Sequence, residues 1–278
     1  MQYFNYNGKL FENDTPVISA GSRGLRYGDG LFETIKCVNN QLIFADEHFA
    51  RLWKGMGVLQ FDIPKYFSPD VLLQQANALL KKNDHQKKAR IRITIFRGNG
   101  GLYDAADHNP NYIIETWPLT EDTGGWNSNG LVLGIYEAAK KSCDILSNLK
   151  HNNYLPYVLA ALHAKQQKWN DAIVLNSFER VCDTTIANIF YCKEESIYTP
   201  ALSEGCVAGV VRKKIIIALK ENGVNLVEKA ITVEEILTAE EVFLTNSILD
   251  IRWVRSIADK QYTNLLTRKI AALFQTIS

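Results

Sequence analysis

The sequence lacks most of the features that assign a chain quickly to a class. Its 278 residues carry 31 Lys and Arg against 30 Asp and Glu, so no excess of positive charge indicates nucleic acid or an anionic membrane. No apolar run approaches the roughly 20 residues that span a bilayer. The first residues also lack the basic and apolar regions of a signal peptide. We therefore expect a cytoplasmic protein whose partners are small molecules, not nucleic acid or membrane.

Cysteine pairs and common catalytic motifs are missing as well. The five cysteines are an odd number and form no CxxC motif, which argues against a zinc site or a disulfide framework and favours a reducing compartment. HExxH, GxSxG and Walker patterns are absent. We expect no metal site, and any chemistry must be found in less conspicuous patterns.

The composition is that of an ordinary globular protein, with 46% hydrophobic and 22% charged residues, and the length suffices for two compact domains. The polar stretch Pro118–Gly125 is rich in helix and strand breakers. A domain boundary there predicts a smaller N-terminal α/β domain, residues 1–120, and a larger C-terminal domain, residues 121–278.

In the N-terminal half, Asn7-Gly8 predicts a hairpin turn, and the four glycines of Gly21–Gly30 predict a loop. A strand is expected over Leu31–Val38, and a second hairpin turn at Asn39-Asn40 leads into a strand over Gln41–Phe44. A helix capped by Asp46 and a second helix over Pro69–Lys82 should follow.

The stretch Ala89–Arg97 alternates like a strand with one apolar face. Its isoleucines point one way, and Arg90, Arg92 and Thr94 point the other. Two arginines on one face could line an anion pocket or form the solvated face of an edge strand, and spacing alone leaves both open.

In the C-terminal half, helices are expected over Tyr154–Lys168 and Lys213–Glu221 and a strand over Glu241–Thr245. The glycines of Gly205–Arg212 precede the second helix, so its start is either a phosphate site or an ordinary helix start. Lys150 lies among apolar and amide residues. Desolvation there would lower the pKa of its amine and make it a nucleophile. The same sequence pattern also fits an ordinary surface lysine.

Four sequence blocks, taken together and in order, resemble the class IV aminotransferases, the fold-type IV pyridoxal-phosphate family. They are Tyr27–Glu33, His48–Leu52, Lys150–Leu155 and Asp183–Phe190, and Gly209–Arg212 is a looser fifth. The resemblance extends over nearly the whole chain. It implies an α+β enzyme with a small N-terminal domain, a larger C-terminal domain with a mixed sheet or barrel, pyridoxal 5′-phosphate as cofactor, and a homodimer.

The resemblance also implies residue roles. Lys150 matches the lysine that forms a Schiff base with the cofactor and then moves the substrate's α-proton. Arg51 matches the arginine that binds the cofactor phosphate, and as a residue on a helix surface it would carry little core packing. The remaining cofactor contacts that the resemblance implies are Val210 and Val211 through their backbone N–H groups, Ser247 on the phosphate, Val207 against the ring, and Tyr154 on the ring hydroxyl.

Asp183 departs from the family pattern, which has glutamate at this position. The carboxylate is expected to face the pyridine nitrogen and keep it protonated, so that the ring can accept electrons. Aspartate carries the same charge on a side chain that is one methylene shorter.

Within the family, Phe32 and Tyr154 resemble the branched-chain aminotransferases, whereas the spacing from Lys150 to Asn153 resembles the lyase and D-amino-acid members. We expect transfer of an amino group between an L-amino acid and a 2-oxo acid. The alternative is 4-amino-4-deoxychorismate lyase, which makes 4-aminobenzoate and pyruvate. Arg90 and Arg92 match positions that line the substrate pocket. Because two adjacent guanidiniums repel each other without an anion between them, they predict a dicarboxylate such as glutamate or 2-oxoglutarate among the substrates.

Overall fold

The computed structural model describes residues 2–277 and divides into two compact units. The first unit runs to Thr123 and also contains Leu149–Asn153; the second contains Gly124–Asn148 and continues from Tyr154. The predicted boundary after residue 120 lies three residues before this division. The return of Leu149–Asn153 to the first unit was not predicted. Each unit is described on its own below.

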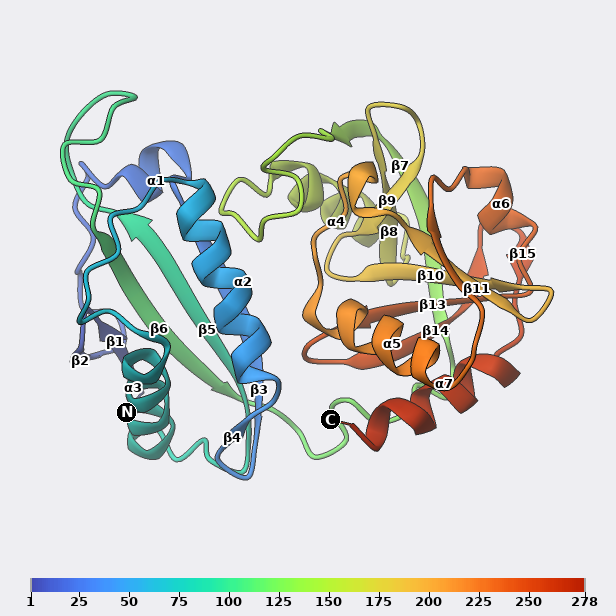
Figure 1. Cartoon of the computed structure of the whole chain (residues 1–278), viewed down its shortest axis with the longest axis horizontal. Coiled ribbons are helices and arrows are strands. Elements are labelled where there is room, and N and C mark those ends of the chain that lie inside the picture. Colours follow the sequence, from blue (N-terminus) through green and yellow to red (C-terminus); the bar gives the residue numbers. More distant parts are fainter. Residues whose placement is uncertain (1, 278) are drawn as a thin grey trace. The chain divides into compact units, whose positions relative to one another are not determined.

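The first unit is an antiparallel sheet with two main helices (Figure 1). Its strands follow the order β2-β1-β6-β5-β3-β4. The elements of this unit are β1 (Tyr3–Tyr6), β2 (Lys9–Glu12), α1 (Arg23–Tyr27), β3 (Gly30–Val38), β4 (Gln41–Leu42), α2 (Ala45–Val58), α3 (Pro69–Lys82), β5 (Lys88–Arg97) and β6 (Pro110–Pro118).

The core of this unit lies between one face of the sheet and helices α2 and α3. Ile91, Ile93 and Ile95 of β5 are fully buried there against helix residues such as Leu52 and Leu79. The arginines of β5 lie on the opposite, half-buried face, as the alternation predicted. This places Arg90 and Arg92 outside the apolar core, where they can carry chemistry.

Three local predictions for this part of the chain need correction. The glycine-rich loop contains the short helix α1, which ends at Tyr27 and is followed by Gly28 in the left-handed region. Helix α2 is preceded by Phe44 in the cap position, so Asp46 lies in its first turn and is not its cap. Strand β4 is shorter than the predicted Gln41–Phe44.

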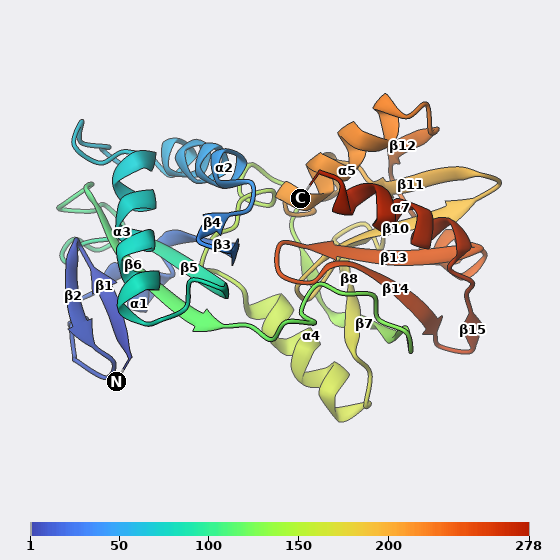
Figure 2. The ribbon, with the colours of Figure 1, turned by 90° about the horizontal axis from the view of Figure 1, so that it is seen from below.

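The second unit is a mixed sheet surrounded by helices (Figure 2). Its strands follow the order β12-β11-β10-β13-β14-β7-β8-β9, with β15 beside β14. The elements are β7 (Leu131–Lys141), α4 (Leu155–Gln166), β8 (Asp171–Asn176), β9 (Val181–Thr184), β10 (Asn188–Lys193), β11 (Ser196–Pro200), a 3₁₀ turn (Leu202–Glu204), α5 (Val210–Glu221), β12 (Leu226–Lys229), α6 (Val233–Leu237), β13 (Glu241–Asn246), β14 (Asp250–Ile257), β15 (Lys260–Gln261) and α7 (Leu265–Gln275).

The sheet of the second unit curls, because the terminal strand β9 also contacts β10. Pairings of β7 with β8 and with β14 are parallel, and most others are antiparallel. Helix α5 begins at Val210, three residues earlier than predicted. The α+β architecture with a mixed, curled second sheet agrees with the fold expected from the sequence.

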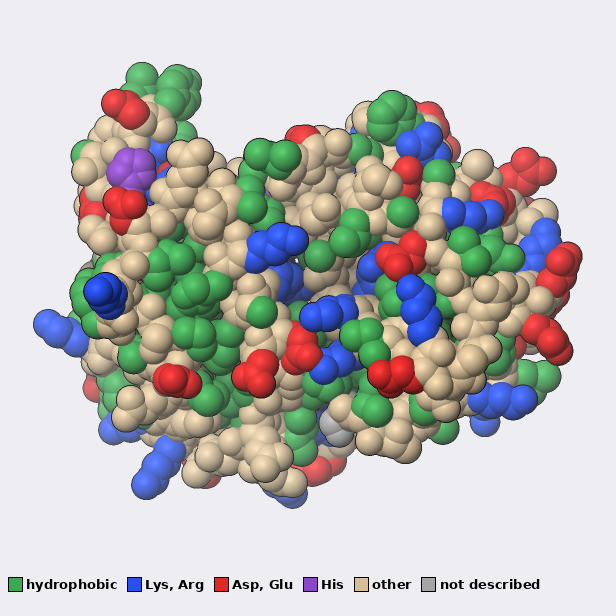
Figure 3. Space-filling model, viewed as in Figure 1, with side chains coloured by type: hydrophobic (Ala, Val, Ile, Leu, Met, Phe, Trp, Pro, Cys, Tyr) green, Lys and Arg blue, Asp and Glu red, His purple; other side chains and the backbone are tan. Residues whose placement is uncertain are grey.

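The face drawn in Figure 3 carries charged side chains of both signs. Lys and Arg side chains alternate with Asp and Glu over the face in Figure 3, in keeping with the net charge of +1. Among residues 2–277, no helix combines the length and the apolar character needed to cross a bilayer.

Candidate active site

Lys150 is held in the first unit by backbone hydrogen bonds to the start of β3. The N–H of Phe32 donates to the Lys150 carbonyl at 2.9 Å, and the N–H of Asn152 donates to the Gly30 carbonyl at 3.0 Å. Leu149 is buried in the core of the same unit. The backbone of Lys150 is thus fixed, and its Nζ lies 4.5 Å from the centre of the Phe32 ring.

Beside Lys150, a buried carboxylate is bound by two basic side chains. Glu33, 1% exposed, accepts from Nε of Arg51 at 2.7 Å and from its Nη2 at 2.6 Å. Nδ1 of His48 lies 2.6 Å from the same carboxylate. Burial alone would raise the pKa of Glu33, but the charges of Arg51 and His48 and their hydrogen bonds outweigh it and lower the pKa to about 2.

The pKa of His48 is lowered, because burial lowers it more than Glu33 raises it, and the Arg51 and Lys150 charges add to the lowering. A neutral ring this close to a carboxylate must carry its proton on Nδ1 and donate it. The guanidinium of Arg51 is therefore fixed in orientation by a carboxylate that is itself fixed by His48. The Arg51 side chain is only 13% exposed, so the expectation of a helix-surface residue with little packing was wrong.

Arg92 contacts the same aromatic ring as Lys150. Its guanidinium carbon is 3.8 Å from the centre of the Phe32 ring, and its Nε donates to Oγ1 of Thr94 at 3.1 Å. Phe32 therefore contacts both the Lys150 ammonium and the Arg92 guanidinium.

Arg90 is placed differently from Arg92. Its guanidinium stacks 4.1 Å from the centre of the Trp117 ring. Glu115 pairs directly with Arg92 across the sheet; burial raises its pKa, while Arg92 and Arg90 partly oppose that rise. Glu115 therefore places a carboxyl group beside both arginines within the sheet.

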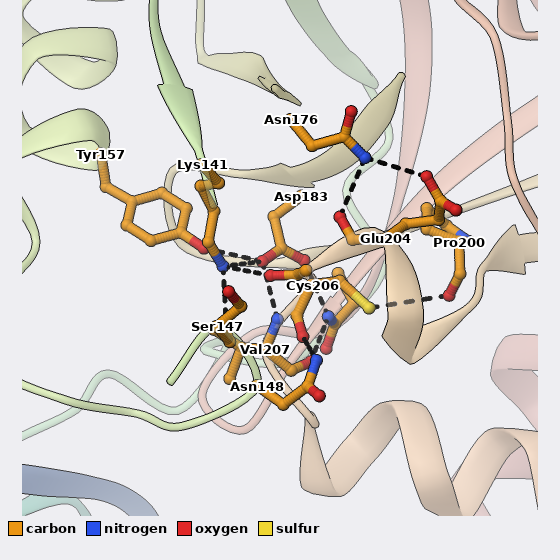
Figure 4. A network of polar contacts seen from close by, with 12 residues as sticks. Lys141, Ser147, Asn148, Tyr157, Asn176, Asp183, Pro200, Glu204, Cys206 and Val207 are labelled. Atoms are coloured by element: carbon orange, nitrogen blue, oxygen red, sulfur yellow. Dashed lines mark hydrogen bonds and ion pairs between the residues drawn. The ribbon is translucent and has the colours of Figure 1, made fainter. Parts of the chain in front are cut away.

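A second group of polar side chains surrounds Asp183 in the second unit (Figure 4). The carboxylate is 2% exposed, and its Oδ2 accepts from Tyr157 Oη at 2.7 Å and from the Val207 N–H at 2.9 Å. Nζ of Lys141 is 3.4 Å from the same oxygen, and Nδ2 of Asn188 donates to Oδ1 at 2.9 Å. Burial raises the pKa of Asp183, and Lys141, the Val207 N–H and Tyr157 oppose this only in part.

The start of α5 completes this group. Gly209 occupies the cap position, and no side chain caps the helix. A Cβ on Gly209 would lie 1.9 Å from Oδ1 of Asn188, so the backbone can pass here only as glycine. Val210 and Val211 are 4% and 2% exposed, which directs their side chains into the core and leaves their backbone N–H groups at the helix start.

The comparisons with known proteins identify the family and the fold of the chain. Residues 30–257 match the family model for amino-transferase class IV. This chain belongs to the class IV aminotransferase family. The aminodeoxychorismate lyase of Vibrio harveyi is 32% identical over 243 residues, covering 87% of this chain and 88% of the relative.

Two solved structures show that the fold is shared. A branched-chain aminotransferase from Thermoproteus uzoniensis, solved with norvaline, has a TM-score of 0.90 at 22% identity and covers 99% of this chain and 93% of its own. A branched-chain aminotransferase from T.th., solved with pyridoxamine 5′-phosphate, has a TM-score of 0.88 at 19% identity and covers 99% and 94%. The predicted family, fold class and enzyme class are confirmed.

As a class IV aminotransferase family member, the chain uses pyridoxal 5′-phosphate, as predicted. The second unit fits the phosphate of this cofactor. The uncapped N-terminus of α5 offers backbone N–H groups to an anion. Thr245, 2% exposed at the end of β13, has a buried Oγ1 without a hydrogen-bond partner in the described part of the chain. Ser247 follows two residues later.

Tyr154 and Val207 also lie in the second unit. Tyr154 immediately precedes α4, and its ring centre is 4.8 Å from that of Tyr157, which bonds Asp183. Val207 is tied to the same group, because its carbonyl accepts from Asn188 at 2.8 Å. The structure thus collects the predicted residues into two groups, one in each unit, with Phe32, Arg51, Arg90, Arg92 and Lys150 in the first.

Among the residues of these groups that sequence reasoning did not assign to the site are Glu33, His48, Lys141 and Thr245. Two of them left a signal. His48 is four residues from Leu52 on the apolar face of α2, and Glu33 interrupts an apolar strand, so both were polar residues at core positions. Lys141 and Thr245 left none, since a lysine at a strand end and a threonine in a strand are ordinary.

Proposed function

We propose that this protein transfers the amino group of an L-amino acid to a 2-oxo acid, with glutamate and 2-oxoglutarate as one pair and with Lys150 forming the Schiff base with the cofactor. One observation carries this proposal. The Lys150 amine and the Arg92 guanidinium contact the same Phe32 ring, at 4.5 Å and 3.8 Å from its centre. An amine next to a carboxylate-binding cation is what an α-amino acid or a 2-oxo acid requires.

Each residue then has a task that its surroundings support. Arg92 binds and orients a substrate carboxylate through charge-assisted hydrogen bonds. Lys150, its backbone fixed on β3, moves the proton at the substrate's α-carbon. Phe32 covers one side of both groups and excludes water from them. When bound, pyridoxal 5′-phosphate supplies the electron sink for this chemistry.

The cofactor's phosphate is proposed to be held by four sites of the chain. Arg51 presents a guanidinium whose plane is fixed by Glu33. The N–H groups of Val210 and Val211 lie at the uncapped start of α5, and Ser247 adds a hydroxyl. Tyr154 is proposed to bond the ring hydroxyl and Val207 to pack against the ring, while Asp183 faces the ring nitrogen.

A second candidate function is aminodeoxychorismate lyase. It is favoured by the 32% identical relative from Vibrio harveyi, which bears that name. The same lysine, arginines and cofactor contacts would serve the lyase. Arg90, whose buried Nε has no hydrogen-bond partner among the described residues, is then available for the second carboxylate of aminodeoxychorismate.

We also propose a homodimer in the cytoplasm. Leu155, Leu159 and Leu162 follow one another on helix α4 at intervals of four and three residues and are 72%, 47% and 53% exposed. Such an apolar stripe is typical of a surface that pairs with another subunit. All five cysteines are free thiols, which suits a reducing compartment.

The experiment that tests the function compares Lys150→Ala with Lys165→Ala, an exposed lysine on α4. Wild type should convert glutamate and a 2-oxo acid in the transaminase assay, and Lys150→Ala should lose activity by several orders of magnitude. Borohydride reduction of the wild-type holoenzyme should attach the cofactor to Lys150. Attachment at another lysine, or full activity of Lys150→Ala, would refute the proposal.

The same preparations separate the two candidate functions. Amino-acid-dependent formation of the pyridoxamine form of the cofactor supports the transaminase. Release of pyruvate from aminodeoxychorismate, without that conversion, supports the lyase.

A further inference from the structure

Lys141 is a buried lysine that the proposed chemistry does not use. It ends strand β7 and is 7% exposed. Its Nζ donates to the Gly205 carbonyl at 2.6 Å and to the Ser147 carbonyl at 3.2 Å, and it lies 3.4 Å from Oδ2 of Asp183 (Figure 4). An ammonium has three protons, so every one of them has an acceptor.

The carbonyls that bind Lys141 are themselves fixed. Gly205 has φ +84°, and a Cβ there would lie 2.4 Å from the Ser142 carbonyl oxygen, so only glycine fits. The preceding Glu204 is 5% exposed and is bonded to Asn176 and Arg180. The ammonium therefore occupies a rigid pocket, where it is poorly placed to act as a nucleophile and well placed to act as a fixed charge.

The charge of Lys141 acts on one group. Within residues 2–277, Lys141 is the only basic side chain that forms an ion pair with Asp183. The other donors to Asp183, which are Tyr157, Asn188 and the Val207 N–H, are neutral. Burial raises the pKa of Asp183, and Lys141 is the largest opposing influence. Burial also raises the pKa of Tyr157 well above its usual value, so this hydroxyl remains a donor.

The four donors are unevenly distributed over the carboxylate. Oδ2 accepts from Tyr157, Val207 and Lys141, whereas Oδ1 has one donor in the described structure, Asn188. Each carboxylate oxygen has about two lone-pair sites; on Oδ2 the short bonds from Tyr157 and Val207 fill them, with Lys141 beside them as an ion pair at 3.4 Å, and on Oδ1 one site remains open. With Oδ2 anchored on three sides, the side chain cannot rotate to offer a different oxygen.

We propose that Lys141 is a positioning residue, which keeps Asp183 in its anionic form and presents Oδ1 to the protonated ring nitrogen of pyridoxal 5′-phosphate. This inference rests on the proposed role of Asp183. The Lys141 ammonium stabilises the negative charge of Asp183, a deeply buried aspartate with a short side chain. The proton on the ring nitrogen is retained because the acceptor facing it stays ionised.

The first test measures melting temperatures of the full-length, cofactor-free protein between pH 5 and pH 8. Lys141→Met removes the charge, and Lys140→Met, at the neighbouring residue with a partly exposed ion pair to Glu179, is the matched control. Without Lys141, the pKa of Asp183 rises further, so ionisation of Asp183 opposes folding as the pH rises. We expect the melting temperature of Lys141→Met to lie about 10 °C below that of wild type at pH 8. At pH 5 the difference should be less than half as large.

A double variant separates charge from packing. Adding Asp183→Asn to Lys141→Met removes the unpaired carboxylate, so the double variant should melt above Lys141→Met at pH 8 and lose the pH dependence of the difference. Lys141→Arg should retain most of the wild-type profile. A Lys141→Met variant that follows Lys140→Met at every pH, or a loss that is equal at pH 5 and pH 8, would overturn the proposal.

The second test observes the ring nitrogen directly in the holoenzyme. ¹⁵N NMR of cofactor labelled at that nitrogen should report a protonated ring in wild type and in Lys140→Met, and an unprotonated ring in Lys141→Met. An unchanged signal in Lys141→Met would refute the link to the cofactor. Protein that binds no cofactor would refute the proposed function instead, and the melting profiles would then decide the Lys141–Asp183 pairing by themselves.

Discussion

Each unit of the protein has a buried carboxylate in its candidate site, Glu33 in the first and Asp183 in the second, and the two differ in how their charge is balanced. Glu33 is 1% exposed and Asp183 is 2% exposed, so burial is nearly equal. Glu33 accepts two hydrogen bonds from one guanidinium at 2.7 and 2.6 Å, whereas the ammonium beside Asp183 is 3.4 Å away. The pKa of Glu33 is lowered to about 2 and that of Asp183 is raised. The difference in direction follows from the partners rather than from the depth of burial, because both Arg51 and His48 bond to Glu33, whereas one more distant ammonium lies beside Asp183.

The different partners of Glu33 and Asp183 suit the two carboxylates to different roles. A bidentate guanidinium makes Glu33 a permanent anion that serves to hold Arg51. The group around Asp183 is mostly neutral, so its carboxylate keeps an affinity for a further positive partner. Glu33 therefore serves to orient Arg51, whereas Asp183 can still bind a further positively charged group.

The largest expected effect comes from breaking the first cluster. Arg51→Ala leaves Glu33 buried with His48 as its one partner among residues 2–277, which should lower the free energy of unfolding by about 3–5 kcal/mol. Urea denaturation at pH 7 measures this, with Lys54→Ala, an exposed residue on the same helix, as control. A loss below about 1 kcal/mol would mean that the Glu33 pairing contributes no more than a surface ion pair.

The pH dependence of stability tests the same cluster without removing the arginine. The folded pKa of Glu33 lies below its usual 4.5, so its stabilisation is complete above that value and is lost as the pH falls towards about 2. The loss should amount to about 3 kcal/mol. Glu33→Gln should lack this component when unfolding is followed between pH 6 and pH 2. If Glu33→Gln lost as much free energy of unfolding between pH 6 and pH 2 as wild type does, this prediction would be contradicted.

Removing a neutral donor from the second cluster should have a smaller effect. Tyr157→Phe deletes the 2.7 Å hydrogen bond to the charged Oδ2 of Asp183 and should lower the free energy of unfolding by about 1.5–3 kcal/mol. In the control Tyr262→Phe, the lost bond goes to a neutral carbonyl at 3.0 Å, and the loss should be about 1 kcal/mol. Equal losses in the two variants would indicate that Asp183 carries no charge.

The smallest effect on stability is expected from a group with no partner at all. Thr245→Val replaces a buried hydroxyl that forms no hydrogen bond within residues 2–277, so the cofactor-free protein should be unchanged or more stable by up to about 1 kcal/mol. Thr199→Val, which removes a 2.9 Å bond to the Ile189 carbonyl, should instead be destabilising. Weaker cofactor binding by Thr245→Val, measured by dialysis, would show that the hydroxyl serves the phosphate.

Much of the secondary structure could be predicted because its determinants are local. Helix α3 was predicted over its observed range, Pro69–Lys82, since Ser68 caps it and proline occupies its first position. Strand β5 followed from strict alternation. Helix α1 could not be predicted, because Arg23 in it is fixed by Asp29 and by carbonyls of residues 100 and 102, which are distant in sequence.

The candidate site was predictable only where residues resemble the family's motifs. Lys150, Arg51 and Asp183 were found in this way. Their partners were not, because the pairing of Glu33 with Arg51 and of Lys141 with Asp183 joins residues 18 and 42 positions apart. Chain folding decides these contacts, and no short pattern records them.

The placement of Leu149–Asn153 in the first unit has a consequence for synthesis of the chain. Residues up to Thr123 leave the ribosome first, but the stretch that pairs with Gly30 and Phe32 of β3 follows about 25 residues later. At a translation rate of about 5–20 residues per second, this edge of the nascent sheet stays open for seconds. During that interval the nascent chain presents an unpaired strand edge, which is the kind of surface that chaperones protect and that aggregation exploits. The residue proposed to carry the chemistry therefore lies in the last piece needed to complete the first sheet.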